Sequence, residues 1–225
     1  MYHWVQDKDY LKRAYSVCAD IVNQLKNELE KDGIKASMKV VGSMNRHMVT
    51  QNEREPIDFD FNLFIEEASS MDANALKETV RKAFNRVLQR NGWGDCMDST
   101  SVLTTEQRVF DKGNKTPFSI DVCIVGYNDF GQLQRLKHEK TGFVQSDRWY
   151  WNEVPNSDKL KEKENFLKPK YWHEVRETYL EKKKMYLSRN DYNHPSFVCY
   201  IEAVNEVYSK KNGSQSFFRN GFFQG

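Results

Sequence analysis

The chain has 225 residues, of which 39% are apolar and 29% charged, and 34 Lys and Arg against 32 Asp and Glu give a net charge of +2. This length suits one or two domains and is enough to bury a sizeable core. No apolar run approaches the length of a membrane span, and the first residues lack the apolar core of a signal peptide. We expect a globular protein whose charge is too balanced to indicate a nucleic-acid binder.

The four cysteines lie far apart in the sequence and form no paired spacing: Cys18, Cys96, Cys123 and Cys199. Paired spacings are typical of zinc sites and disulfide frameworks, so the pattern argues against both. Unpaired cysteines suit a reducing cytoplasm. We therefore expect a cytoplasmic protein whose cysteines pack as small core residues.

The first part of the chain alternates between helical and strand-like patterns. Apolar residues recur at helical spacing over 9–30 and again over 73–88, and each run ends at a glycine-containing stop signal. Strand-like runs accompany these helices over 37–41, 57–65, 101–110 and 118–125. The pattern predicts an α+β domain over residues 1–145.

The last part of the chain has almost no strand signal. Three helices are predicted there, near 157–168, 170–188 and 195–210. We therefore expect a second, helical domain over residues 146–225.

Two aspartates share one face of the strand predicted over 57–65. Alternate residues of a strand point to the same side, so the apolar residues between them form one face while Asp58 and Asp60 point together from the other. Two nearby carboxylates repel unless a cation lies between them, and a divalent ion with hard oxygen ligands suits that place. Magnesium usually binds through carboxylates and substrate phosphates, so the pair also indicates a phosphorylated ligand.

A third aspartate, Asp121, interrupts the β-branched run over 118–125. If that strand lies beside the first, three carboxylates converge, and such a set can hold two metal ions for an in-line phosphoryl displacement. Asp121 could then accept the proton of the attacking hydroxyl. The alternative is that an Asp-x-Asp pair on an exposed strand is only a solvated face.

Gly42 and Ser43 follow the strand predicted over 37–41. A glycine after a strand lets the backbone approach a bound phosphate, and a helix beginning at Ser43 would offer its free amides to that phosphate. The Ser43 hydroxyl could cap such a helix and contact a nucleotide. Arg46 and His47, in the loop that follows, are interpreted as solvated or capping residues.

The set formed by Gly42-Ser43, Asp58-x-Asp60 and Asp121 resembles the signature of the DNA-polymerase-β-type nucleotidyltransferase superfamily, over about residues 40–125. The resemblance implies a mixed sheet flanked by helices, and a helical C-terminal domain that closes over the nucleotide base. It implies transfer of a nucleoside monophosphate from an NTP, with ATP favoured, to an acceptor hydroxyl with release of pyrophosphate. By match to the motif, Gly42 and Ser43 hold the donor phosphates, Asp58 and Asp60 bind metal, and Asp121 binds the second metal and acts as base. The implied cofactors are two Mg²⁺ ions, with Mn²⁺ as a substitute.

The spacing of the motif bears on the branch of the superfamily. Sixty-one positions separate Asp60 from Asp121. This long interval resembles that of archaeal CCA-adding enzymes, oligoadenylate synthases and bacterial cyclic-oligonucleotide synthases. The chain length is closer to that of small bacterial nucleotidyltransferases, including antibiotic-modifying ones. The loop over 44–48 lacks the second glycine that many members carry. The acceptor stays open between a nucleotide, an RNA end, a small molecule and a protein.

Other functions are compatible with the same residues. A second hypothesis is a non-catalytic nucleotide or RNA sensor on the same fold, and a third is a component of a toxin–antitoxin or defence system. The lysines and aromatics over 156–190 fit a nucleic-acid groove. We favour instead helices whose aromatics face the core and whose lysines face water. The apolar tail over 217–223 is expected to pack on the helical domain or on a second subunit, which leaves a homodimer open.

Overall fold

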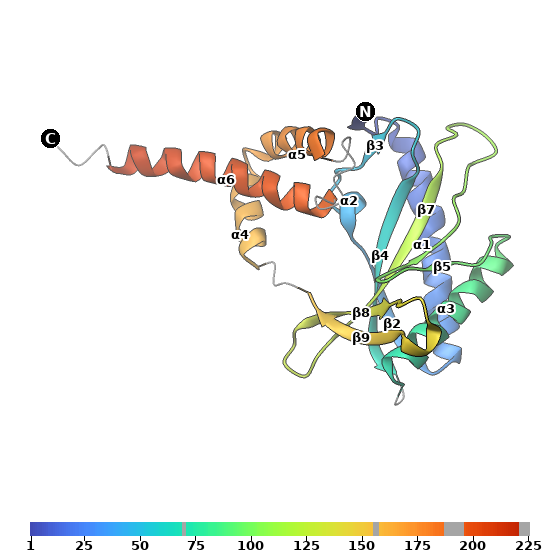
Figure 1. Cartoon of the computed structure of the whole chain (residues 1–225). Coiled ribbons are helices and arrows are strands. Elements are labelled where there is room, and N and C mark those ends of the chain that lie inside the picture. Colours follow the sequence, from blue (N-terminus) through green and yellow to red (C-terminus); the bar gives the residue numbers. More distant parts are fainter. Residues whose placement is uncertain (69–70, 155–157, 187–195, 221–225) are drawn as a thin grey trace. The chain divides into compact units, whose positions relative to one another are not determined.

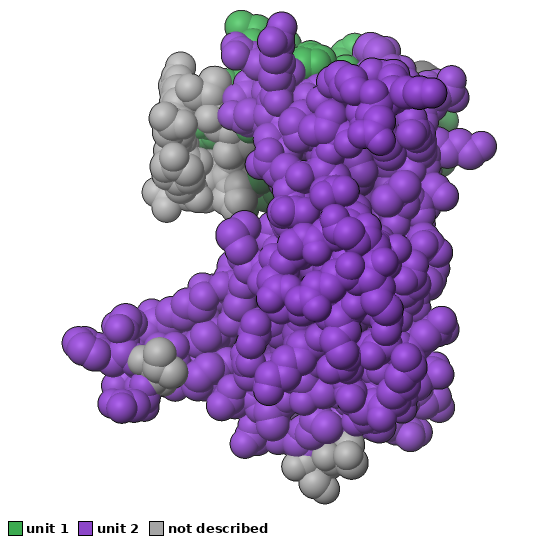
Figure 2. Space-filling model, turned by 90° about the vertical axis from the view of Figure 1, so that its right-hand side faces the viewer, with its two compact units in different colours: residues 1–4, 155–225 green, residues 5–154 purple. Residues whose placement is uncertain are grey.

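The computed structural model describes residues 1–225 except 69–70, 155–157, 187–195 and 221–225, and it describes only the backbone of residues 144, 158 and 213–220. The chain forms two compact units (Figures 1 and 2). The sheet unit comprises residues 5–154, and the helical unit comprises residues 1–4 and 155–225. Among the described residues, no helix has both the length and the apolar character that a membrane crossing needs.

The sheet unit contains most of the strands and two long helices. Its helices are α1 (Lys8–Lys31), α2 (Gly42–Asn45) and α3 (Ala73–Arg90), with a 3₁₀ turn over Val144–Ser146. Its strands are β2 (Ile34–Val40), β3 (Thr50–Asn52), β4 (Ile57–Ala68), β5 (Met97–Asp98), β6 (Leu103–Thr104), β7 (Phe118–Tyr127), β8 (Leu133–Glu139) and β9 (Arg148–Glu153).

The main sheet is mixed, with the strand order β2-β4-β7-β6-β5, and β8 pairs with both β7 and β9. The central pair, β4 and β7, is parallel. The other pairs in this sheet are antiparallel. The prediction of an α+β fold with a mixed sheet flanked by helices is confirmed.

The helices α1 and α3 cover one face of this sheet (Figure 1). Asp7 caps α1 by accepting a hydrogen bond from the Tyr10 amide at 2.9 Å, and Asp72 caps α3 in the same way at the Ala75 amide. Gly33, with φ +74°, follows the last turn of α1 as a glycine does at many helix ends. The core packs against the apolar face of β4 and β7, which consists of Ile57, Phe59, Phe61, Leu63, Ile120, Val122 and Ile124.

Two expectations about strands are wrong. The strand predicted over 101–110 is reduced to β6 and an isolated bridge between Arg108 and Phe118. Between them, Glu106 accepts hydrogen bonds from the Gly94 amide at 2.9 Å and from Arg108 at 3.1 Å. Strand structure also continues past residue 145, since β8 and β9 form a hairpin within the sheet unit. The many polar side chains of β8 hide its pattern, whereas the aromatic run over 149–151 in β9 is typical of a strand.

The helical unit contains β1 (Tyr2–Trp4), α4 (Asp158–Leu167), α5 (Trp172–Tyr186) and α6 (Ser196–Asn220). The three predicted helices are present, and α6 continues ten residues beyond the predicted end at 210. Helix α6 packs against both α4 and α5, and α5 also contacts β1. The apolar tail falls outside the side chains that the structure describes, so its packing stays a prediction.

For helix α5, the expectation that aromatic residues face the core and lysines face water is met only in part. Tyr179 is buried and lies 6.1 Å from the Trp4 ring, as expected for a core aromatic. Lys182 reaches the surface acids Glu202 and Glu206 at 3.5 and 3.0 Å. Lys183, however, is buried, and its ammonium lies 4.6 Å from the centre of the Tyr2 ring. Contact with an aromatic face stabilises an ammonium that has lost its water.

Candidate active site

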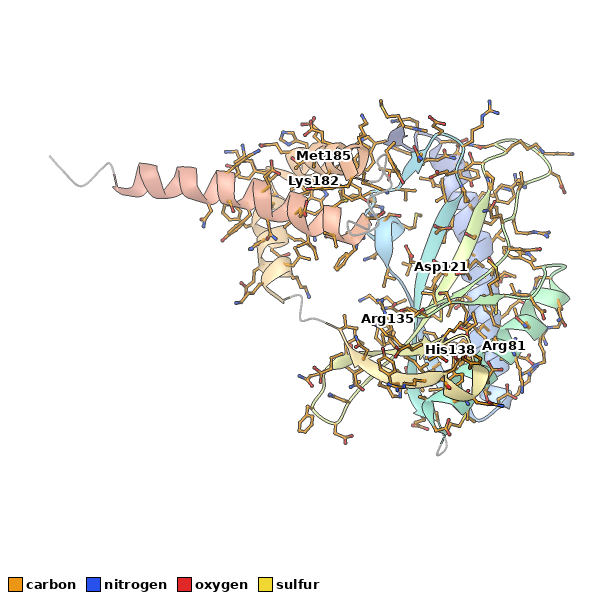
Figure 3. The ribbon with its side chains drawn as sticks, viewed as in Figure 1. Arg81, Asp121, Arg135, His138, Lys182 and Met185 are labelled. Atoms are coloured by element: carbon orange, nitrogen blue, oxygen red, sulfur yellow. The ribbon has the colours of Figure 1, made fainter. Side chains whose placement is uncertain are left out.

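The three predicted aspartates lie on one face of the central strand pair. In the parallel pairing of β4 with β7, Asp60 stands directly opposite Asp121, and Asp58 stands opposite Ser119. Phe59 and Phe61 point into the core from the other face, so the alternation of side chains directs the carboxylates away from α1 and α3. The structure therefore brings Asp58, Asp60 and Asp121 together, and Figure 3 labels Asp121 on β7.

Two hydroxyl groups hold the outer carboxylates of this set. The Ser119 hydroxyl donates a hydrogen bond to Oδ1 of Asp58 at 2.5 Å. The Thr104 hydroxyl, on β6, donates to Oδ1 of Asp121 at 2.6 Å. Each bond fixes a carboxylate in place, so the set is preorganised by neighbouring strands.

The carboxylates perturb one another. Burial raises the pKa of Asp60 to about 6, and the nearby charges of Asp121 and Asp58 add to that rise. Burial also raises the pKa of Asp121, while the Thr104 hydrogen bond acts to lower it. Half-buried acids that repel each other in this way are stabilised by a cation placed between them.

Gly42 brings the backbone directly against Asp60. Gly42 has φ +65°, and a Cβ atom added there would lie 2.0 Å from Oδ2 of Asp60. The Val41 amide also donates to the Asp60 carbonyl oxygen at 2.9 Å, which ties the turn to the strand. Only glycine combines this conformation with this close approach, so the turn at residues 42–43 is fixed beside the carboxylates.

The expected capping role of Ser43 is wrong. The helix α2 begins at Gly42, not at Ser43, and it spans four residues. Its N-cap is Val41, and no side chain makes the capping hydrogen bond. Because Ser43 already lies inside the first turn, its hydroxyl is not in the N-cap position.

Two arginines beside the carboxylates were not assigned to the site from the sequence. Arg46, interpreted there as a solvated loop residue, is half-buried, and its charge acts to lower the pKa of Asp60. Arg135 on β8 has the same effect on Asp60, and Figure 3 labels Arg135 and Asp121. A single arginine in a polar strand gives no signal in sequence. Only the pairing of β8 with β7 places Arg135 on the carboxylate face.

A second polar cluster ties the β8–β9 hairpin to the rest of the sheet unit. His138 is buried, and its ring nitrogens lie 2.6 Å from Asp98 and 3.0 Å from Asp147. The buried Lys77 on α3 forms an ion pair with Asp98 at 2.7 Å. Trp149 on β9 stacks on the His138 ring with a 4.3 Å separation. These contacts join α3, β5, β8 and β9.

The cavity beside this second cluster is separate from the three aspartates. Its volume is about 550 Å³, and it is lined by Asn74, Glu78, His138, Lys140, Gly142, Asp147 and Trp149. His138 and Arg135 are three residues apart on a strand, so they point to opposite faces of β8. The cavity therefore does not include the carboxylate face.

The donor set of the site suits a hard divalent cation. Three carboxylates offer the oxygen ligands that Mg²⁺ and Mn²⁺ prefer. Among the described residues, no three His, Cys, Asp or Glu side chains are gathered closely enough to enclose an ion as they stand. The fit therefore rests on the chemistry of the three aspartates and on their mutual repulsion, which such an ion would relieve.

Comparison with known proteins identifies the fold. The chain is similar to solved structures of DncV from Vibrio cholerae, described as a cyclic AMP-GMP synthase. The GTP-bound form aligns with a TM-score of 0.55 at 14% identity, over 79% of this chain and 46% of DncV. The complex with the linear intermediate pppA(3′,5′)pG aligns with a TM-score of 0.55 at 13% identity, over 79% of this chain and 48% of DncV.

The similarity shows that the chain has the fold of the polymerase-β-type nucleotidyltransferases, which confirms the prediction of that fold. A form of DncV bound to 3′-deoxy GTP gives a TM-score of 0.56 at 14% identity, over 79% of this chain and 46% of DncV. The chain spans a little under half the length of these relatives. No protein-family model and no curated protein sequence matches it.

Proposed function

We propose that the protein is a metal-dependent nucleotidyltransferase that moves a nucleoside monophosphate from an NTP, with ATP as the expected donor, to an acceptor hydroxyl. The observation that carries the proposal is the register of β4 and β7, which sets Asp60 opposite Asp121 beside Asp58. The glycine turn against Asp60 supplies backbone next to these carboxylates. The DncV structures with GTP and with a linear dinucleotide intermediate support nucleotide chemistry on this fold.

The residues of the site have distinct roles in this reaction. Asp58, Asp60 and Asp121 would hold the two Mg²⁺ ions, and such ions would supply charge stabilisation for the attacking and leaving oxygens. Gly42 and Ser43 bind the donor phosphates, since the turn lies beside Asp60 and its glycine leaves room for them.

Asp121 acts as the general base. The acceptor oxygen forms a bond to the α-phosphorus, and its proton passes to a carboxylate oxygen of Asp121. The bond from the α-phosphorus to its bridging oxygen breaks, and pyrophosphate leaves with that electron pair. Burial raises the pKa of Asp121, which makes its carboxylate a stronger base.

The experiment is to incubate the full chain with labelled NTPs and Mg²⁺, with and without cell extract, and to measure pyrophosphate and labelled products. Asp58→Ala and Asp121→Asn are expected to lower the rate by at least about 100-fold, because each removes a charge that stabilises the transition state. Asp129→Asn, in the exposed turn after β7, is the matched control and leaves the rate unchanged.

Unchanged turnover in Asp121→Asn, with the fold intact, would refute the proposal. Tight NTP binding without transfer to any acceptor would instead favour a non-catalytic sensor. The closing of the helical unit over the base stays a prediction from the sequence.

A further inference from the structure

Arg135 carries a buried donor atom that has no partner within the part of the chain that the structure describes. Its Nε is buried and makes no hydrogen bond there. Arg135 pairs with Val125, and Cys123 stands two residues before Val125 on the same face of β7. A buried guanidinium donor without an acceptor is unfavourable, so the position suits an anionic ligand.

The register places Arg135 at a defined distance along the strands. Arg135 pairs with Val125, and Val125 pairs with Phe64. These positions are four residues beyond Asp121 and Asp60, or roughly 13 Å along the strand. Residues in register share a face, so the Arg135 side chain lies on the same face of the sheet as the three aspartates.

The glycine turn approaches the carboxylates from the opposite direction. The strand β2 is antiparallel to β4, and its last residue, Val40, pairs with Phe61. The chain therefore leaves β2 toward the beginning of β4, where the Val41 amide reaches the Asp60 carbonyl oxygen. The Gly42–Ser43 turn lies against Asp60 on the β2 side, whereas Arg135 lies on β8, beyond Asp121, so the two are on opposite sides of the carboxylates.

An in-line displacement separates the two substrates across the carboxylates. The leaving pyrophosphate and the attacking hydroxyl must lie on opposite sides of the α-phosphorus. If the turn holds the donor phosphates, the acceptor hydroxyl enters from the side where Arg135 lies. Arg135 is then a neighbour of the acceptor and not of the leaving group.

We propose that Arg135 binds a phosphate group of the acceptor and so selects phosphate-bearing acceptors over neutral or cationic ones. This inference rests on the proposed nucleotidyl transfer. A guanidinium binds phosphate through paired, charge-assisted hydrogen bonds, and it repels a cationic acceptor such as an aminoglycoside. The His138 cluster fixes the strand that carries Arg135, which makes this position rigid.

The test compares two acceptors that carry the same ribose hydroxyls, with ATP as saturating donor. GTP bears phosphate and guanosine does not. Arg135→Gln is expected to lower kcat/KM for GTP by about 10- to 100-fold, as expected for losing a charge-assisted hydrogen bond. Turnover of guanosine and the KM for ATP are expected to change less than about threefold. Arg135→Lys keeps the charge but loses the planar guanidinium, so it should retain part of the preference for GTP over guanosine. If Arg135→Gln fails to fold, Arg135→Lys still tests the proposal.

Arg148→Gln, at an exposed position of β9, is the control and leaves both acceptors unaffected. An equal loss with GTP and guanosine, or a raised KM for ATP, would overturn the role assigned to Arg135. Better transfer to an aminoglycoside than to GTP would do the same.

A binding measurement separates this inference from the proposed function. Equilibrium dialysis uses the Asp121→Asn protein, with the donor site saturated by a non-hydrolysable ATP analogue. Tighter binding of GTP than of guanosine, lost in the added Arg135→Gln, supports Arg135 as the phosphate-binding residue even if no acceptor is modified. The absence of that preference refutes it, whereas the absence of any transfer refutes the nucleotidyltransferase proposal.

Discussion

Replacing Asp60 by Asn is expected to stabilise the protein at neutral pH while abolishing its proposed activity. Burial raises the pKa of Asp60 to about 6, and the charges of Asp121 and Asp58 add to the rise. In the unfolded chain this carboxyl titrates near its ordinary pKa of 3.8. The folded state therefore binds the proton more tightly, and ionising Asp60 at pH 7 destabilises the fold.

The size of the effect follows from the shift of about two pKa units. Each unit corresponds to about 1.4 kcal/mol, so the ionised Asp60 costs the folded state about 3 kcal/mol at pH 7. Asn is neutral at every pH and close to Asp in shape, so Asp60→Asn recovers most of this energy. For a domain of this size the gain raises Tm by about 6–12 °C.

The sign of the pH dependence makes the assay specific. A carboxyl with a raised folded-state pKa contributes full stability below its unfolded pKa and loses it as the pH rises through the folded value. The gain in Tm from Asp60→Asn should therefore be near zero at pH 4 and reach its full size above about pH 7, measured in EDTA by thermal unfolding. The exposed Asp129→Asn should shift Tm by no more than about 1–2 °C at either pH.

Two results would refute this reasoning. A gain of equal size at pH 4 and pH 7 would show that packing, not charge, causes it. The absence of any gain at pH 7 would show that neither burial nor the neighbouring carboxylates destabilise the ionised Asp60 in the fold. Added Mg²⁺ should raise the Tm of the wild-type chain more than that of Asp60→Asn, since the ion relieves the repulsion.

Three further outcomes are expected. Gly42→Ala forces a side chain onto the Asp60 carboxylate and strains a positive φ, so it should destabilise the chain by about 1–3 kcal/mol in urea unfolding and weaken NTP binding. Thr104→Val removes the hydrogen bond that lowers the pKa of Asp121, so the acid limb of the pH–rate profile should move to higher pH. Lys77→Met removes the buried ammonium that pairs with the half-buried Asp98 and should cost about 3 kcal/mol, most of it recovered when Asp98→Asn is added.

The local sequence pattern was sufficient to predict the helices α1 and α3 and the two central strands, β4 and β7. The helices α1 and α3 follow from their apolar spacing and their stop signals, and β4 and β7 follow from an alternating run and a β-branched run. The strand β8 could not be predicted, because its alternation is masked by charged side chains and its pairing with β7 comes from distant parts of the chain.

The sequence by itself determined which residues have the chemistry of the site: aspartates at alternate positions of a strand must share a face, since the period of a strand is two. Only the tertiary structure decided that β7 lies parallel and adjacent to β4, which sets Asp121 opposite Asp60. The same is true of Gly42 against Asp60 and of Arg135 beside Cys123. Register between strands depends on packing across the whole sheet, and no local run of residues contains that information.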